Sequence, residues 1–119
     1  MTILPDTSVW IDFWRHGSRR LTHALTHGRV VVHPFVRGEI ALGFVPGREQ
    51  AFEYLDRFER PRLADHEEVL ALIERAPLWG RGIGWVDAHL LASALLDHVQ
   101  LWTLDRRLAR VAHDLGVAA

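Results

Sequence analysis

The sequence predicts an α/β fold, a three-layer sandwich in which helices cover both faces of a central parallel sheet of four to five strands. Short apolar or β-branched runs alternate with longer stretches of helical periodicity, and most are separated by glycine or proline. Such alternation is typical of parallel sheets, because parallel strands need a crossover between them. The 119 residues contain no internal repeat, linker or low-complexity segment, so we expect one domain over residues 1–119.

The expected strands are short and rich in valine, isoleucine and leucine. They are Thr2–Leu4, Arg29–Pro34 and Gln100–Thr103, with weaker candidates at Pro61–Ala64 and Gly116–Ala119. The first strand should stop at Pro5, which has no N–H to donate to a ladder.

The expected helices have apolar residues three or four positions apart. One begins near Ser8 and ends at Gly17, one begins after the cap residue Asp65, and the others are Arg19–His27, Pro34–Gly43, Arg48–Arg57, Trp85–His98 and Asp105–Leu115. The glycine-rich segment Pro77–Gly84 is predicted to be a loop.

Composition excludes several classes of protein. Hydrophobic residues make up 49% of the chain, enough for a core, and the absence of cysteine excludes disulfide scaffolds, zinc–thiolate sites and thiol nucleophiles. No signal-peptide pattern appears and no apolar run approaches the ~20 residues of a membrane span, so we expect a cytoplasmic protein without a membrane partner. The net charge is −1 and all 14 basic residues are arginine, which codon bias in a GC-rich genome explains more simply than RNA contact.

Four acidic residues are expected at one edge of the sheet, because the carboxyl ends of parallel strands lie together. Asp6 and Asp105 each follow a strand, and Glu39 lies within two turns of the start of the helix after the second strand. Asp87, in the first turn of Trp85–His98, joins them if its helix begins there. Each acid also has a structural interpretation: Asp6 and Asp105 as helix N-caps, Asp87 as a partner of the helix dipole, and Glu39 as a solvated residue.

Carboxylates that converge repel one another unless a cation neutralises them. Oxygen ligands favour Mg²⁺ or Mn²⁺, and a water on such an ion is acidified enough to attack a phosphodiester. On the residues alone, this metal site and the structural interpretations both remain open.

Four motifs occur in order along the chain: D-T-S-V-W-I-D-F at Asp6–Phe13, G-E-I-A-L-G-F at Gly38–Phe44, G-W-V-D-A-H-L-L-A-S-A-L at Gly84–Leu95 and L-W-T-L-D-R-R-L at Leu101–Leu108. Together they resemble the motifs of PIN-domain ribonucleases, and more narrowly those of the VapC toxins of bacterial toxin–antitoxin pairs. The resemblance implies a PIN-like fold and a Mg²⁺- or Mn²⁺-dependent endoribonuclease that cuts tRNA, rRNA or mRNA. It also implies a homodimer and inhibition by a small antitoxin protein.

The resemblance also assigns site residues. It implies that the catalytic, metal-binding carboxylates are Asp6, Asp87, Glu39 and Asp105, oriented by the hydroxyl groups of Thr7, Ser8 and Thr103.

Arginine and tryptophan residues outside this set also have candidate roles. Arg81 and Arg106 should lie near the acidic edge and contact RNA phosphates. Trp79 and Trp85 fit base stacking or core packing, and core packing is favoured for Trp85. Arg37 fits an intramolecular salt bridge.

Two surface features have more than one interpretation. His23 and His27 have a zinc-ligand spacing, but the sequence supplies no evident third ligand. The helical hairpin Phe35–Phe58 carries surplus apolar residues that fit an antitoxin helix or a dimer contact.

Two other functions compete with this one. One is a non-catalytic PIN-like module that binds RNA or a partner. The other is an α/β phosphatase or nucleotide binder, but Ser8 stands where an aspartyl phosphatase would have its second Asp, and Thr7–Trp10 contains no glycine.

Overall fold

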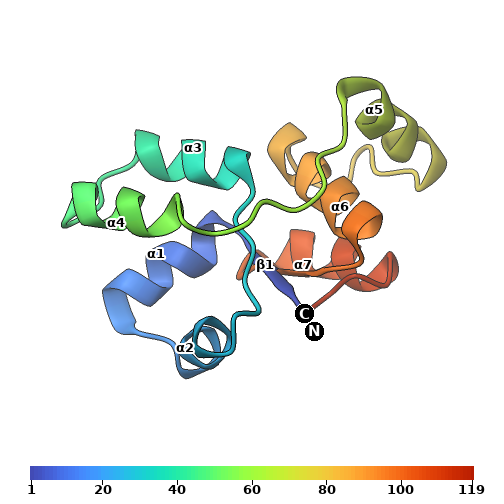
Figure 1. Cartoon of the computed structure of the whole chain (residues 1–119). Helices are drawn as coiled ribbons and strands as arrows, with labels where there is room; N and C mark the ends of the chain where they lie inside the picture. Colours follow the sequence, from blue (N-terminus) through green and yellow to red (C-terminus); the bar gives the residue numbers. More distant parts are fainter.

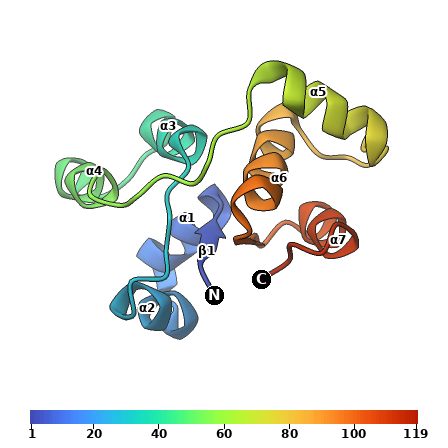
Figure 2. The ribbon, with the colours of Figure 1, turned by 45° about the vertical axis from the view of Figure 1, so that its right-hand side comes forward.

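The computed structural model describes all 119 residues. Its elements, in chain order, are β1 (Ile3–Pro5), α1 (Thr7–His16), α2 (Arg19–Thr26), α3 (Pro34–Leu42), α4 (Arg48–Leu55), α5 (His66–Arg75), α6 (Trp85–Asp97), β2 (Gln100–Trp102) and α7 (Arg106–Asp114). Helices α1–α4 lie on one side of β1 and helices α5–α7 on the other, and both termini lie close together (Figures 1 and 2). The α/β class with helices on both sides is therefore confirmed.

The sheet is smaller than predicted. β1 and β2 pair in parallel, with Ile3 opposite Gln100 and Pro5 opposite Trp102. Two isolated parallel bridges, Ile3 to Val30 and Leu101 to Ala118, add one further segment on each side of this pair. Four parallel segments therefore lie side by side. Only two of these segments are strands, so the predicted strands at Arg29–Pro34 and Gly116–Ala119 are reduced to isolated bridges.

Proline at the end of β1 explains why pairing with the Val30 segment is so short. Ile3 donates its N–H to the carbonyl of Arg29 (2.7 Å) and accepts from the N–H of Val31 (3.0 Å). The next β1 residue facing that side is Pro5, which has no N–H. Val32 instead donates to the carbonyl of Glu59 (3.0 Å).

β1 ends at Pro5, as the sequence predicts, although one more backbone hydrogen bond to β2 follows it. Asp6, the residue after it, still donates its N–H to the carbonyl of Trp102 (2.9 Å). The prediction of a strand at Pro61–Ala64 is wrong, because that segment is irregular and connects α4 to α5.

The predicted helices and the loop Pro77–Gly84 are confirmed, with boundaries shifted by one or two residues. Gly17 ends α1 at a positive φ of 75°. Asp65 and Glu68 form a reciprocal capping box at the start of α5. No helix combines the length and apolar character that a membrane crossing requires.

Helix α6 has the longest buried stretch of any helix. Every residue from Ala88 to Ala94 is buried, and the helix packs against both α5 and β2. Across the sheet, Leu4 and Trp10 are fully buried on β1 and α1. The turns at the carboxyl ends of the strands, and the start of α6, are therefore fixed to a rigid core.

Burial of His33 predicts a loss of stability in mild acid. His33 caps α3 by accepting the N–H of Phe35 at Nδ1 (2.9 Å), and its side chain is only 2% exposed. Burial, together with the nearby charges of His89 and Arg60, lowers its pKa from 6.5 to about 4. The folded state therefore binds the proton more weakly than the unfolded state, so stability is complete above pH 6.5 and falls between pH 6.5 and 4.

We expect His33 to contribute a loss of about 2 kcal/mol in the free energy of unfolding between pH 7.5 and pH 5, measured by urea denaturation. The variant His33→Asn can still cap α3 but does not titrate, so it should lose correspondingly less over the same range. Equal losses in the two proteins would contradict the assignment to His33.

Candidate functional site

Asp6 lies where β1 meets α1, at the carboxyl end of the strand. It is the N-cap of α1, accepting the N–H of Val9 at Oδ1 (3.2 Å). The hydroxyl of Ser8 donates to the same oxygen and that of Thr103 donates to Oδ2, both at 2.5 Å. With only 7% of Asp6 exposed, these three donors replace the solvent that burial removes.

The predicted hydroxyl residues join the two strand ends. Ser8 accepts the N–H of Leu104 (3.0 Å), and Thr103 accepts the N–H of Asp105 (3.0 Å). Each hydroxyl thus accepts from the β2–α7 turn while donating to Asp6. The two turns are locked together with the Asp6 carboxylate between them.

Asp87 lies close enough to Asp6 and Asp105 for their negative charges to affect its pKa. Asp87, in the first turn of α6, accepts the N–H of Gly84 at Oδ2 (3.0 Å). Partial burial, and then the negative charges of Asp6 and Asp105, raise the pKa of Asp87, against the opposing effect of the Gly84 hydrogen bond. Asp105 caps α7, so it too faces the edge where the strands end.

Glu39 lies at the rim of this group. It is exposed on α3 and is linked to the strand end by the hydroxyl of Thr7, which donates to its Oε1 (2.8 Å). The structure thus brings Asp6, Asp87 and Asp105 to one edge, with Glu39 attached through Thr7. As they stand, no three carboxylate or imidazole groups of the chain lie close enough together to hold one metal ion.

Comparison with known proteins agrees with the four motifs. Residues 3–114 match the sequence profile of the PIN domain. The chain belongs to the PIN-domain family. Two strains of Mycobacterium tuberculosis, CDC 1551 / Oshkosh and ATCC 25618 / H37Rv, each have a protein named Ribonuclease VapC32 that is 43% identical over 117 residues, covering 98% of this chain and 94% of the relative. The predicted resemblance to VapC-type PIN domains is therefore confirmed.

Arginines gather along α7, the helix that Asp105 caps. Arg81 and Arg106 line a hollow of about 350 Å³, and Gly80, Arg107 and Arg110 complete its lining. Arg81 also forms an ion pair with Asp114 (2.7 Å) and thereby lowers the pKa of that carboxyl. Sequence reasoning missed Arg107 and Arg110, although their spacing from Arg106 places all three within about one turn of a helix.

Two other side chains take different surroundings from those expected. Trp85 is 42% exposed, so the preference for core packing was wrong; it lies before the buried stretch of α6 and contacts the rings of His66 and His89. Arg37 does form a salt bridge, and its partner is Asp56 on the neighbouring hairpin helix (2.7 Å).

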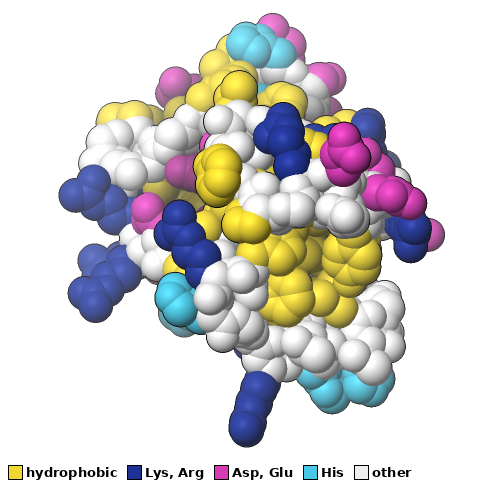
Figure 3. Space-filling model, turned by 90° about the vertical axis from the view of Figure 1, so that its left-hand side faces the viewer, with side chains coloured by type: hydrophobic (Ala, Val, Ile, Leu, Met, Phe, Trp, Pro, Cys, Tyr) yellow, Lys and Arg dark blue, Asp and Glu magenta, His cyan; other side chains and the backbone are white.

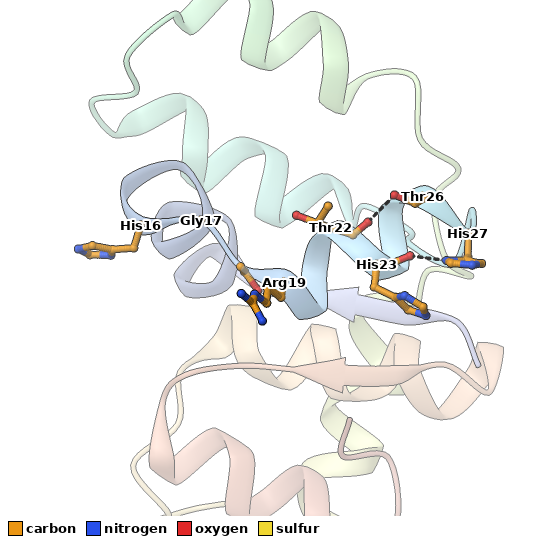
Figure 4. Close-up of a pocket in the computed structure, with 8 residues that line it drawn as sticks. His16, Gly17, Arg19, Thr22, His23, Thr26 and His27 are labelled. Carbon is orange, nitrogen blue, oxygen red and sulfur yellow. Dashed lines mark hydrogen bonds between the residues drawn. The ribbon is translucent and has the colours of Figure 1, made fainter.

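A larger hollow, of about 590 Å³, lies between the end of α1 and α2, away from the carboxylates. It is lined by His16, Gly17, Ser18, Arg19, Thr22, His23, Thr26 and His27 (Figure 4). The Nδ1 of His27 donates to the carbonyl of His23 (2.8 Å), and the ring of His16 points away from both. The rings of His23 and His27 lie 4.2 Å apart, but His16 does not join them, and no three ligand groups lie close enough to hold a metal ion.

Proposed function

We propose that the chain, acting as one domain over residues 1–119, is a metal-dependent endoribonuclease and the toxin of a VapC-type toxin–antitoxin pair. The observation that carries the proposal is the position of Asp6, Asp87 and Asp105 at the edge where both strands end, near enough for the charges of Asp6 and Asp105 to raise the pKa of Asp87. The ribonuclease name of the 43% identical relatives supports the same chemistry.

The donor set fits a hard divalent cation, Mg²⁺ or Mn²⁺. Asp87, Asp105 and Glu39 each use one carboxylate oxygen in hydrogen bonds to the protein and keep the other free. We propose Asp6 and Asp87 as the principal ligands, with Glu39 and Asp105 completing the catalytic cluster. Such a cation would offset the mutual repulsion of the carboxylates and supply an acidified water for attack on phosphorus.

The protein's own side chains and helix termini would orient the carboxylates and the RNA. Ser8 and Thr103 hold both oxygens of Asp6 in place, and Thr7 holds Glu39. Helices α1 and α7 begin at this edge, and the positive ends of their dipoles favour the approach of a phosphodiester. Arg81 and Arg106, beside the carboxylates, would hold neighbouring RNA phosphates.

A hydrophobic surface on the α3–α4 side is the proposed site for protein partners. Leu42, the last residue of α3, and Phe44, in the loop that follows, are 92% and 91% exposed. Hydrophobic side chains gather on this side of the molecule (Figure 3). Exposed apolar side chains of this size favour an apolar helix of an antitoxin, and a second copy of the chain is the other proposed partner.

Cleavage of RNA by the purified protein tests the proposed function. We expect structured RNA to be cut when Mg²⁺ or Mn²⁺ is present, to survive when excess EDTA is added, and to be cut again when the metal is restored, all followed on a denaturing gel. Cutting that persists in EDTA would contradict the metal dependence. RNA that binds without being cut in any metal would instead favour the rival, a non-catalytic PIN-like binding module.

A further inference from the structure

We propose that the hollow lined by Arg81, Arg106, Arg107 and Arg110 is a separate subsite for a phosphate of the RNA strand. This phosphate would be adjacent to the phosphodiester that is cut at the carboxylates. This inference rests on the proposed ribonuclease function and adds to it the position of the flanking RNA backbone. We call this hollow the arginine subsite.

The charges of the arginine subsite oppose the stability of the helix that carries them. Arg106 and Arg107 occupy the first turn of α7, where the helix dipole disfavours cations. Arg106 and Arg110 are four residues apart on the same helix, so their charges repel. None of these three arginines forms an ion pair with an acidic residue of the chain. A bound phosphate would turn each of these unfavourable terms into a favourable one.

The loop before α6 holds one of the arginines in position. At Gly82, whose φ is +77°, an added Cβ would lie 2.7 Å from Cδ and 2.8 Å from Nη1 of Arg107. The side chain of Arg107 therefore lies directly against the glycine backbone. Arg81 is held by its ion pair with Asp114, at the end of α7. Two of the four guanidinium groups are thus constrained before any ligand arrives, which lowers the entropic cost of binding.

The position of the subsite points to RNA. The loop ends at Gly84, whose N–H holds Asp87, and Arg106 directly follows Asp105. An RNA strand carries a phosphate at every nucleotide, so a strand with one phosphate at the carboxylates would present a neighbouring phosphate to the arginines. Guanidinium groups match phosphate oxygens in bidentate geometry, and the hollow of about 350 Å³ is within the size range of ligand sites.

Binding of a fluorescent single-stranded oligoribonucleotide, measured by anisotropy in EDTA over a range of salt concentrations, tests the subsite without cleavage. The double variant Arg106→Gln/Arg110→Gln should bind about tenfold more weakly at low salt. The plot of log affinity against log salt concentration has a negative slope, and each lost phosphate contact should make that slope shallower by about 0.7. Glutamine is a good helix former, so α7 should persist, which circular dichroism can verify.

The matched control is Arg15→Gln/Arg29→Gln, which removes the same charge from two exposed arginines on other segments. Equal loss of affinity in the two double variants would overturn the subsite and leave the ribonuclease function standing. Unchanged RNA binding with weaker binding of poly-L-glutamate would show that the hollow recognises an acidic peptide, and would also overturn it. Failure of the wild-type protein to bind RNA would overturn the proposed function and the subsite together.

Discussion

The variant Asp87→Asn is expected to lose RNA cleavage by at least about 10³-fold while keeping or slightly raising its stability. Asparagine preserves the shape of the side chain and an oxygen that can accept the N–H of Gly84. It removes a negative charge that burial and the charges of Asp6 and Asp105 already disfavour, which is why the pKa of Asp87 is raised. The lost charge is one that the proposed catalytic cation would need, and such ions supply several kcal/mol of transition-state stabilisation.

Cleavage under single-turnover conditions, beside urea denaturation of the same preparations, measures both effects. Asp12→Asn is the matched control, because Asp12 is also an aspartate on a helix, α1, but is paired with His16 on the surface (3.1 Å). The control should cut RNA at the wild-type rate. Retention of cleavage by Asp87→Asn would refute its role as a metal ligand.

Local signals in the sequence predict the helices and the acidic edge well. Each helix has its own apolar periodicity. The N-caps of three helices, Asp6, Asp65 and Asp105, can be recognised in the sequence as single residues before the first turn. Once the strands are taken as parallel, the chain order alone places Asp6 and Asp105 at one edge. The location of most of the candidate site therefore follows from short-range patterns.

The extent of the sheet depends on contacts that are distant in sequence. A run of three valines predicts a strand at Arg29–Pro34, but pairing there requires an N–H that Pro5 of the neighbouring strand lacks. The sequence shows both segments and does not show that they are neighbours. The strand propensity of one segment is thus overridden by the chemistry of its partner.

Contacts between residues far apart in sequence also decide the surroundings of charged and aromatic side chains. Arg37 pairs with Asp56 and Arg81 with Asp114, at separations of 19 and 33 residues, which no local pattern indicates. Trp85 is exposed because the buried stretch of α6 begins three residues later, at Ala88. Helical periodicity identifies a face, whereas exposure at a helix end depends on what the fold places next to it.

The variant Asp6→Asn is expected to lose cleavage as completely as Asp87→Asn but, unlike it, to lose stability. Both oxygens of Asp6 accept hydrogen bonds from buried donors, whereas an amide has only one acceptor oxygen. If that oxygen keeps the bonds at Oδ1, the amide nitrogen faces the hydroxyl of Thr103, which loses its acceptor.

A buried donor left without an acceptor costs about 1–3 kcal/mol, so urea denaturation should show a loss of that size for Asp6→Asn and none for Asp87→Asn. The chemical change is identical at both positions, and both variants lose one negative charge at this edge. The difference between their unfolding free energies therefore measures the hydrogen bonds that hold Asp6. Equal stability in the two variants would mean that Ser8 and Thr103 do not hold Asp6 as the structure places them, and that the position of this carboxylate has another cause.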